Sequence, residues 1–125
     1  MILVVDDDPD IRSLVRSILE TAGHVVVEAA HGKAALDIIR PNLAPDIVIT
    51  DLTMPVLSCT ELIERLHSEQ VTAAIPIVVV SASSDAERIF QGSGLVQAVI
   101  RKSFDVHALV DCIERVAAGS GNRAA

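Results

Sequence analysis

The sequence predicts an α/β protein in which one parallel sheet is covered by helices on both faces. Apolar runs of strand length alternate along the chain with segments of helical periodicity, so that five strand–helix units follow one another. The apolar runs are mostly continuous, as expected of strands that are buried on both faces. These observations predict a doubly wound, flavodoxin-like fold, with a five-stranded parallel sheet of order 2-1-3-4-5 flanked by five helices.

The first half of the chain contains three predicted strands, over residues 2–5, 24–29 and 46–50. Asp8 and Pro9 are a typical N-cap and first residue of a helix, which Gly23 ends. The apolar stripe of this helix comprises Ile11, Leu14, Val15, Ile18 and Leu19. A shorter helix over residues 33–40 is expected to stop at Pro41.

The second half continues the same alternation. Ser58 and Glu61 have capping-box spacing for a helix that runs to about residue 68, and a strand over residues 75–83 follows. A short helix from Ser84 to near Gly92, a strand over residues 97–102 and a last helix from Val106 complete the fold. We therefore expect one domain over residues 1–118, and a flexible tail or the start of a linker over residues 119–125.

Composition narrows the class of protein. The 125 residues carry a net charge of -7, which argues against a general nucleic-acid binder. No apolar run approaches the roughly 20 residues that would span a bilayer, so no membrane partner is expected. The two cysteines, Cys59 and Cys112, indicate reduced thiols rather than a disulfide framework, with Cys112 buried in the last helix. We expect a cytoplasmic protein.

Polar side chains gather where the predicted strands end. Asp6 and Asp7 follow the first strand, Asp51 the third, Ser81 the fourth and Lys102 the fifth. The carboxyl ends of parallel strands meet at one edge of the sheet, and ligands bind there where the strand order reverses. Residues chosen only for solubility would be scattered over both ends of the strands. This arrangement therefore predicts a functional site.

The three carboxylates of this predicted site need a counter-charge. At roughly 6 Å and an effective dielectric constant of about 20, two such charges repel by roughly 3 kcal/mol. An oxygen-lined pocket of this kind suits Mg²⁺, which would offset the repulsion among Asp6, Asp7 and Asp51. A carboxylate beside Mg²⁺, a hydroxyl and an amine is a reasonable nucleophile for phosphoryl transfer.

Four segments, VVDDDPDIR, IVITDLTMP, VVVSAS and RKSF, resemble in order and spacing the receiver domain of two-component response regulators, over about residues 1–118. The resemblance implies that Asp51 accepts a phosphoryl group from a sensor histidine kinase or a phosphotransfer protein. It also implies a Mg²⁺ site formed by Asp6, Asp7, Asp51 and the backbone carbonyl of Thr53. Ser81 and Lys102 would contact the phosphoryl oxygens. Such a domain is a phospho-acceptor in signal transduction rather than an enzyme.

Two positions depart from the family pattern. Val99 stands where the family usually has tyrosine or phenylalanine, and Ser103 stands where it usually has proline. The route by which phosphorylation changes the surface is therefore open. The resemblance also implies a dimerisation or target-binding face formed by the fourth helix, the fifth strand and the fifth helix. Its candidate residues are Ile89, Phe90, Val99 and Arg101.

Two other functions are compatible with parts of the sequence. Val99 and Ser103 would suit a pseudo-receiver that docks partners without phosphorylation. Asp6 and Asp8 have the Asp-x-Asp spacing of a haloacid-dehalogenase-type phosphatase, with Asp6 as nucleophile and Asp8 as general acid. After Lys102, however, the acidic pair that this chemistry needs is missing. Whether the chain is a stand-alone receiver or part of a longer regulator stays open.

Overall fold

The computed structural model describes residues 1–39, 44–51, 59–68, 74–81, 96–101 and 105–124. Five strands and four helices lie within these ranges. In chain order they are β1 (Ile2–Val5), α1 (Pro9–Thr21), β2 (Val26–Ala29), α2 (Gly32–Ile38), β3 (Ile47–Asp51), α3 (Cys59–Ser68), β4 (Ile77–Ser81), β5 (Ala98–Arg101) and α5 (Val106–Ala124). The predicted helix over residues 84–92 lies outside the described residues.

The five strands form one parallel sheet in the order β2-β1-β3-β4-β5, which confirms the predicted topology. The interior strand β1 pairs with β2 and β3, with Val5 opposite Ala29 on one side and Thr50 on the other. At the next pair of strands, Asp51 lies opposite Val80. This register brings the carboxyl ends of β1, β3 and β4 to the same edge of the sheet.

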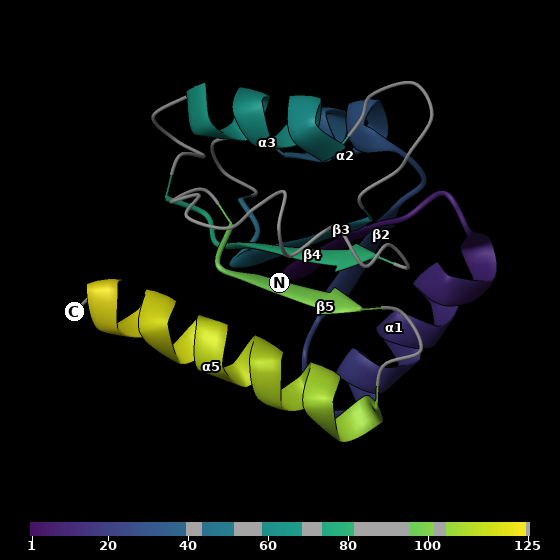
Figure 1. The fold of residues 1–125 in the computed structure, drawn as a ribbon, viewed down its shortest axis with the longest axis vertical. Coiled ribbons are helices and arrows are strands. Elements are labelled where there is room, and N and C mark those ends of the chain that lie inside the picture. Colours follow the sequence, from purple (N-terminus) through teal and green to yellow (C-terminus); the bar gives the residue numbers. More distant parts are fainter. Residues whose placement is uncertain (40–43, 52–58, 69–73, 82–95, 102–104, 125) are drawn as a thin grey trace.

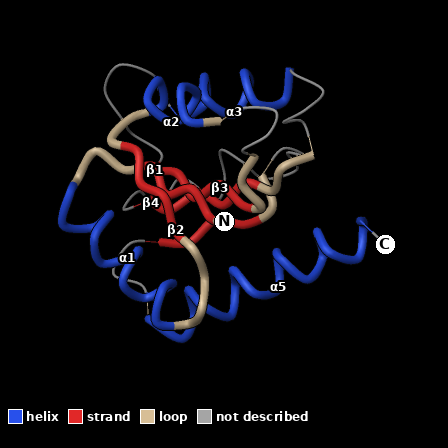
Figure 2. Tube along the Cα trace, turned by 180° about the vertical axis from the view of Figure 1, so that it is seen from behind, coloured by secondary structure: helices blue, strands red, loops and turns tan. Residues whose placement is uncertain are grey.

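Helices cover both faces of this sheet (Figures 1 and 2). α2 and α3 lie over one face, and α1 and α5 lie over the other. Alternate residues of each strand enter the two resulting cores: Leu3 packs on the α2–α3 side, and Val4 packs on the α1–α5 side. Both side chains are almost completely buried. The continuous apolar runs are thus explained, because each strand side chain needs an apolar environment whichever way it points.

The start of α1 matches the prediction in detail. The Asp8 carboxylate accepts hydrogen bonds from the backbone N–H groups of Asp10 (2.9 Å) and Ile11 (3.4 Å), and Pro9 begins the helix. Gly23 follows the helix with a φ of 98°, a conformation that favours glycine. Leu14 differs from the prediction, because it is 49% exposed and lies at the margin of the buried stripe.

The start of α2 has a cap that the periodicity does not reveal. His31 Nδ1 accepts a hydrogen bond from the backbone N–H of Ala34 (3.0 Å), so this side chain takes the place of the usual serine or aspartate. The helix runs from Gly32 to Ile38, and Ile39 already has an extended backbone. The helix thus ends two residues before the predicted limit at residue 40.

The last helix is longer than the sequence indicates. α5 continues to Ala124, through the predicted tail, although the domain boundary at residue 118 stays a prediction. Leu109 and Ile113 of this helix are fully buried against the sheet. Cys112 is free and buried, as predicted, and burial raises the pKa of its thiol. Among the described helices, none has the length and apolar character that crossing a bilayer requires.

The role of Asp8 as the N-cap of α1 can be tested separately from the negative charge of its side chain. We expect Asp8→Ala to lower the free energy of unfolding by about 1 kcal/mol, because two N–H groups lose their acceptor. Asp8→Asn keeps a side-chain oxygen at the same place and should cost less than about 0.5 kcal/mol. Urea unfolding followed by circular dichroism measures both values, and equal losses in the two variants would contradict a capping role.

Candidate functional site

Three carboxylates meet at the edge of the sheet where β1 and β3 end. Asp51 is the last residue of β3, and Asp6 and Asp7 follow directly after β1. Ligand oxygens of Asp6, Asp7 and Asp51 lie within 4.8 Å of one another. The structure therefore brings together the three acidic residues that the sequence places at the ends of neighbouring strands.

Asp6 is held by its neighbours on several sides. Its backbone N–H donates to the carbonyl of Ala29 in β2 (3.1 Å), which continues the ladder between β1 and β2 by one residue. Its Oδ1 accepts a hydrogen bond from the backbone N–H of Asp8 (2.9 Å). With only 4% of its surface exposed, Asp6 is a buried and oriented carboxylate. Buried charges of this kind need partners, and the N–H of Asp8 supplies one of them.

Asp51 and Ser81 are the polar ends of two adjacent buried strands. Asp51 is 7% exposed and Ser81 is 3% exposed. The hydroxyl of Thr50, which precedes Asp51, donates to the Asp51 carbonyl (3.2 Å). Ser81 lies opposite Arg101, the last residue of β5. Lys102 follows Arg101 in the sequence. Lys102 and Thr53 themselves lie outside the described residues.

The donor set fits a magnesium ion. All three side chains offer hard carboxylate oxygens, and the described residues add no thiol or imidazole to the cluster. Asp6 and Asp51 are nearly buried, whereas Asp7 is exposed, so the cluster opens to solvent on one side. This combination suits Mg²⁺, which binds through a few carboxylates and keeps several waters.

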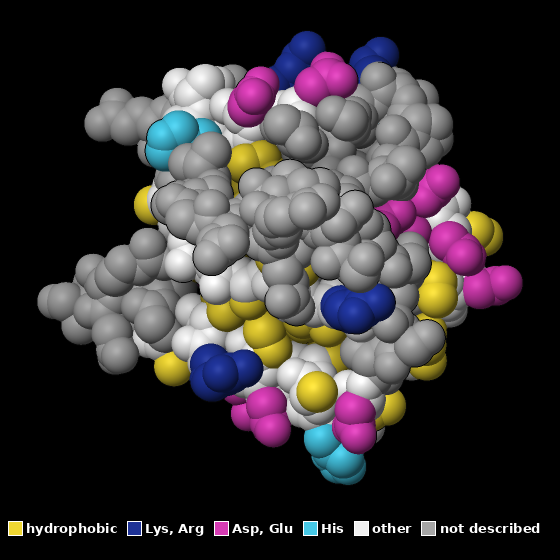
Figure 3. Space-filling model, in the orientation of Figure 1, with side chains coloured by type: hydrophobic (Ala, Val, Ile, Leu, Met, Phe, Trp, Pro, Cys, Tyr) yellow, Lys and Arg dark blue, Asp and Glu magenta, His cyan; other side chains and the backbone are white. Residues whose placement is uncertain are grey.

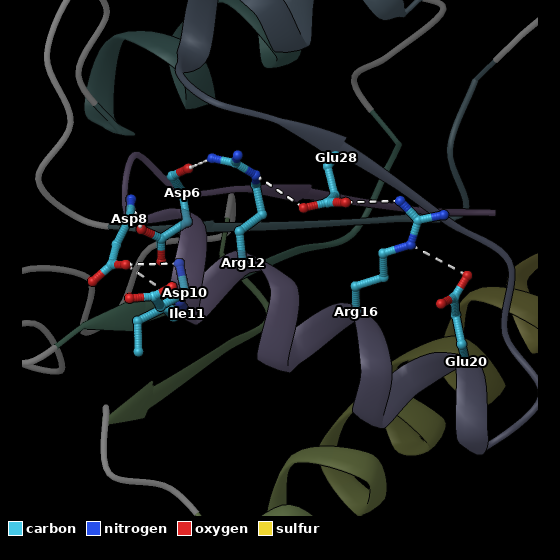
Figure 4. Close-up of polar contacts among 8 residues, drawn as sticks. All are labelled: Asp6, Asp8, Asp10, Ile11, Arg12, Arg16, Glu20 and Glu28. Atoms are coloured by element: carbon cyan, nitrogen blue, oxygen red, sulfur yellow. Dashed lines mark hydrogen bonds and ion pairs between the residues drawn. The ribbon is translucent and has the colours of Figure 1, made fainter.

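A network of ion pairs adjoins the acidic cluster (Figure 4). Arg12 of α1 donates from Nη1 to the backbone carbonyl of Asp6 (2.7 Å) and from Nε to Oε1 of Glu28 in β2 (3.0 Å). Arg16, one turn further along α1, donates from Nη1 to Oε2 of Glu28 (2.7 Å) and lies 3.3 Å from Glu20. The sequence analysis did not identify this network. The only signal was two arginines four residues apart, which is also typical of a solvated helix face.

The network changes the titration of its members. The hydrogen bond from the Arg16 guanidinium, supported by the one from Arg12, holds the pKa of Glu28 below its ordinary value. Burial of the carboxyl group acts in the opposite direction but does not outweigh them. Hydrogen bonds to Glu28 and Glu20 raise the pKa of Arg16. Glu28 is therefore a carboxylate that stays charged in the folded protein at neutral and mildly acidic pH.

The comparison with known protein families decides what this site belongs to. The family described as "Response regulator receiver domain" matches residues 2–114, which is nearly the whole chain. This chain is a response regulator receiver domain. The family also accounts for the sheet order and for the three carboxylates at its edge.

Relatives of the receiver domain occur alone and within longer proteins. A chemotaxis protein CheY homolog of Campylobacter jejuni is 34% identical, over 99% of this chain and 98% of that protein. The sensor histidine kinase TmoS of Ectopseudomonas mendocina is 38% identical, over 86% of this chain but only 11% of the kinase. The receiver domain of NtrX from Brucella abortus has a solved structure with a TM-score of 0.81 and 30% identity, over 94% of this chain and 98% of that one.

The phosphatase alternative is not supported. Its general acid would be Asp8, but the structure assigns Asp8 Oδ1 to the N-cap of α1, where it accepts two backbone hydrogen bonds. The family match and the strand order both belong to the receiver domain. Asp8 is thus the structural member of the three consecutive aspartates, and Asp6 and Asp7 are the members that join Asp51.

Repulsion within the acidic cluster predicts opposite effects with and without metal. At an effective dielectric constant of about 20, two charges 4.8 Å apart repel by about 3 kcal/mol, and exposure of Asp7 reduces this value. In EDTA we expect Asp7→Asn to raise the free energy of unfolding by about 1 kcal/mol. In Mg²⁺ the variant should gain less stability than the wild type, because its site is weaker.

Thermal unfolding with EDTA and with MgCl₂ measures both effects. Glu64→Gln on α3 is the matched control, because it removes one exposed negative charge away from the cluster. Destabilisation of Asp7→Asn in EDTA, or an equal response of Glu64→Gln, would contradict the role of repulsion.

The ion pairs of Glu28 predict a pH-dependent contribution to stability. The folded-state pKa of Glu28 lies below the ordinary value of 4.5, so its contribution is fully present above pH 4.5 and is lost as the pH falls through the folded-state pKa. The difference in stability between the wild type and Glu28→Gln should therefore shrink below about pH 4.5. Urea unfolding between neutral pH and pH 3 measures it, with Glu64→Gln as the control whose difference should stay nearly constant.

Proposed function

We propose that this receiver domain accepts a phosphoryl group on Asp51 from the phosphohistidine of a sensor histidine kinase or of a phosphotransfer protein. The observation that carries this proposal is the position of Asp51. It is a buried carboxylate at the end of a central strand, with the carboxylate oxygens of Asp6 and Asp7 within 4.8 Å and Ser81 at the end of the adjacent strand.

The proposed reaction transfers a phosphoryl group between two protein side chains. A carboxylate oxygen of Asp51 attacks phosphorus, the P–N bond to the donor imidazole breaks, and its electron pair returns to the imidazole nitrogen. Because Asp51 is buried and its backbone is fixed in β3, the attacking oxygen is held in position before the donor arrives. The product is an aspartyl phosphate, and no external substrate is turned over.

The surrounding residues would stabilise the transferred group. Asp6, Asp7, Asp51 and the backbone carbonyl of Thr53 would hold Mg²⁺, which when bound neutralises negative charge on the phosphoryl oxygens. Ser81 would donate its hydroxyl proton to one of these oxygens, and Lys102 would pair with another. Ser81 is the last residue of β4, which pairs with the strand of Asp51. Lys102 follows Arg101, the last residue of β5, which lies one strand further along the sheet.

The proposed output is a change in the population of surface conformations. A face formed by the helix predicted over residues 84–92, β5 and α5 would bind a target or a second copy of the chain. Figure 3 shows hydrophobic side chains on the face that carries β5 and α5, with charged side chains at its border. Arg101 is exposed there, whereas Val99 is only partly buried and packs against the α2–α3 core. A cytoplasmic location would suit a kinase partner.

Phosphorylation at Asp51 is directly testable. Incubation with acetyl phosphate and MgCl₂ should add one phosphoryl group to the wild type, and mass spectrometry after borohydride reduction should locate it at Asp51. Asp51→Asn should add none, because an amide cannot form the acyl phosphate. Replacing MgCl₂ with EDTA should reduce the rate at least about 100-fold, because the three carboxylates then repel the donor phosphate.

Asp8→Asn is the control for this experiment, because it alters an adjacent carboxylate that serves the helix cap. It should be phosphorylated at nearly the wild-type rate. A folded wild type that takes up no phosphoryl group would instead support the pseudo-receiver alternative, in which the domain docks partners without phosphorylation.

A further inference from the structure

The guanidinium of Arg12 joins the acidic cluster to an ion pair on the neighbouring strand. We propose that Arg12 is a positioning residue for the metal site, which it serves by fixing the peptide between Asp6 and Asp7 while Glu28 anchors its guanidinium. This inference rests on the proposed function, because it concerns the residues that would hold Mg²⁺.

The geometry gives Arg12 two separate attachments. Nη1 donates to the Asp6 carbonyl at 2.7 Å, and Nε donates to Oε1 of Glu28 at 3.0 Å. The side chains of Arg12 and Glu28 are 19% and 27% exposed, so solvent screens this pair less than a surface pair. A planar guanidinium can hold two acceptors in fixed directions, whereas a lysine ammonium cannot reproduce the same fork.

The attachment to the Asp6 carbonyl bears on both aspartates. The carbonyl of Asp6 and the N–H of Asp7 belong to one planar peptide unit, so fixing the first restricts the second. The Asp6 N–H is held by Ala29 and its Oδ1 by the N–H of Asp8. Arg12 holds the carbonyl of Asp6 (Figure 4), so Asp6 is fixed on three sides. The plane of the peptide that leads into Asp7 is thereby set.

Glu28 determines the direction in which the guanidinium of Arg12 points. An unanchored guanidinium near three carboxylates would form ion pairs with them and compete with a metal ion. Here the guanidinium of Arg12 pairs with Glu28, and Arg12 contacts the cluster through the backbone carbonyl of Asp6. Arg12 therefore holds the backbone of Asp6, while Glu28 keeps the guanidinium away from the metal-binding oxygens.

Glu28 is itself held from both sides, which provides a matched control. Arg16 binds Oε2 of Glu28 at 2.7 Å, as Arg12 binds Oε1, but the bonds of Arg16 go to Glu28 and Glu20 and not to the Asp6 carbonyl. Arg12→Gln and Arg16→Gln thus remove the same charge from the same helix face and weaken the same glutamate. They differ in the contact with the Asp6 carbonyl, which Arg12 makes, and in the ion pair with Glu20, which Arg16 makes.

The test is the Mg²⁺ dissociation constant of the whole chain, measured by isothermal titration calorimetry. The chain has no tryptophan or tyrosine, so its intrinsic fluorescence is a poor reporter. We expect Arg12→Gln to raise the dissociation constant about tenfold, the lower end of what partners of metal ligands contribute. Arg16→Gln should change it less than about twofold, although thermal unfolding should show a similar loss of stability in both variants.

Arg12→Lys separates positioning from charge. It retains the positive charge, so a purely electrostatic role would keep the wild-type dissociation constant. Because the ammonium cannot hold the Asp6 carbonyl and Glu28 in the same fork, we expect Arg12→Lys to bind Mg²⁺ about as weakly as Arg12→Gln. This variant also serves if Arg12→Gln does not fold.

Several results would overturn the inference. One is a Mg²⁺ dissociation constant within about twofold of the wild type for both Arg12 variants. Another is a wild-type dissociation constant in Arg12→Lys. A third is an increase in the dissociation constant of Arg16→Gln that equals the increase in Arg12→Gln. A wild type that binds no Mg²⁺ would instead reject the proposed function. In acetyl phosphate reactions, excess MgCl₂ should restore most of the rate of Arg12→Gln but none of that of Asp51→Asn, which separates the two kinds of failure again.

Discussion

The parallel register of β1 and β3 is the constraint on which the acidic site depends. Val5 lies opposite Thr50, so Asp6 and Asp51 come next on their strands and end at the same level. A slip of one residue would turn every side chain of a strand to the other face and place Asp51 away from Asp6. The packing of the core opposes this slip: Leu3 and Val48 lie opposite each other, have no exposed surface and pack together on the α2–α3 side, and a slip would separate them. The apolar core thus determines the geometry of the polar site.

The fold could be predicted because its signals are local. A continuous apolar run reports a strand buried on both faces, and Asp8–Pro9 reports the start of a helix, since each depends on residues close in the chain. Strand order followed from the rules for parallel crossovers, and the order in turn placed Asp6, Asp7 and Asp51 together. Helix limits were less predictable: α5 continues to Ala124, through a glycine-containing stretch whose composition is typical of a linker.

The network around Arg12 could not be predicted for a different reason. Its bonds join α1 to β2 and to the peptide after β1, and each depends on the direction of a long side chain. Many surface arginines and glutamates have the same spacing without any fixed partner. His31 is a similar case, because a histidine is an uncommon helix cap and nothing in its neighbours reveals that Nδ1 accepts from Ala34. Specific polar contacts of this kind, made by individual side chains, could therefore not be predicted from the sequence.

The burial of Cys112 makes it a natural reporter of motion in the last helix. Its raised thiol pKa keeps the sulfur protonated at neutral pH, and its position on the buried side of α5 keeps reagents away while the helix is docked. Alkylation at this sulfur would require α5 to separate from the sheet, so its rate would follow the fraction of time that the helix spends detached. Detachment of this helix is thus measurable as alkylation at Cys112, without introducing a label elsewhere.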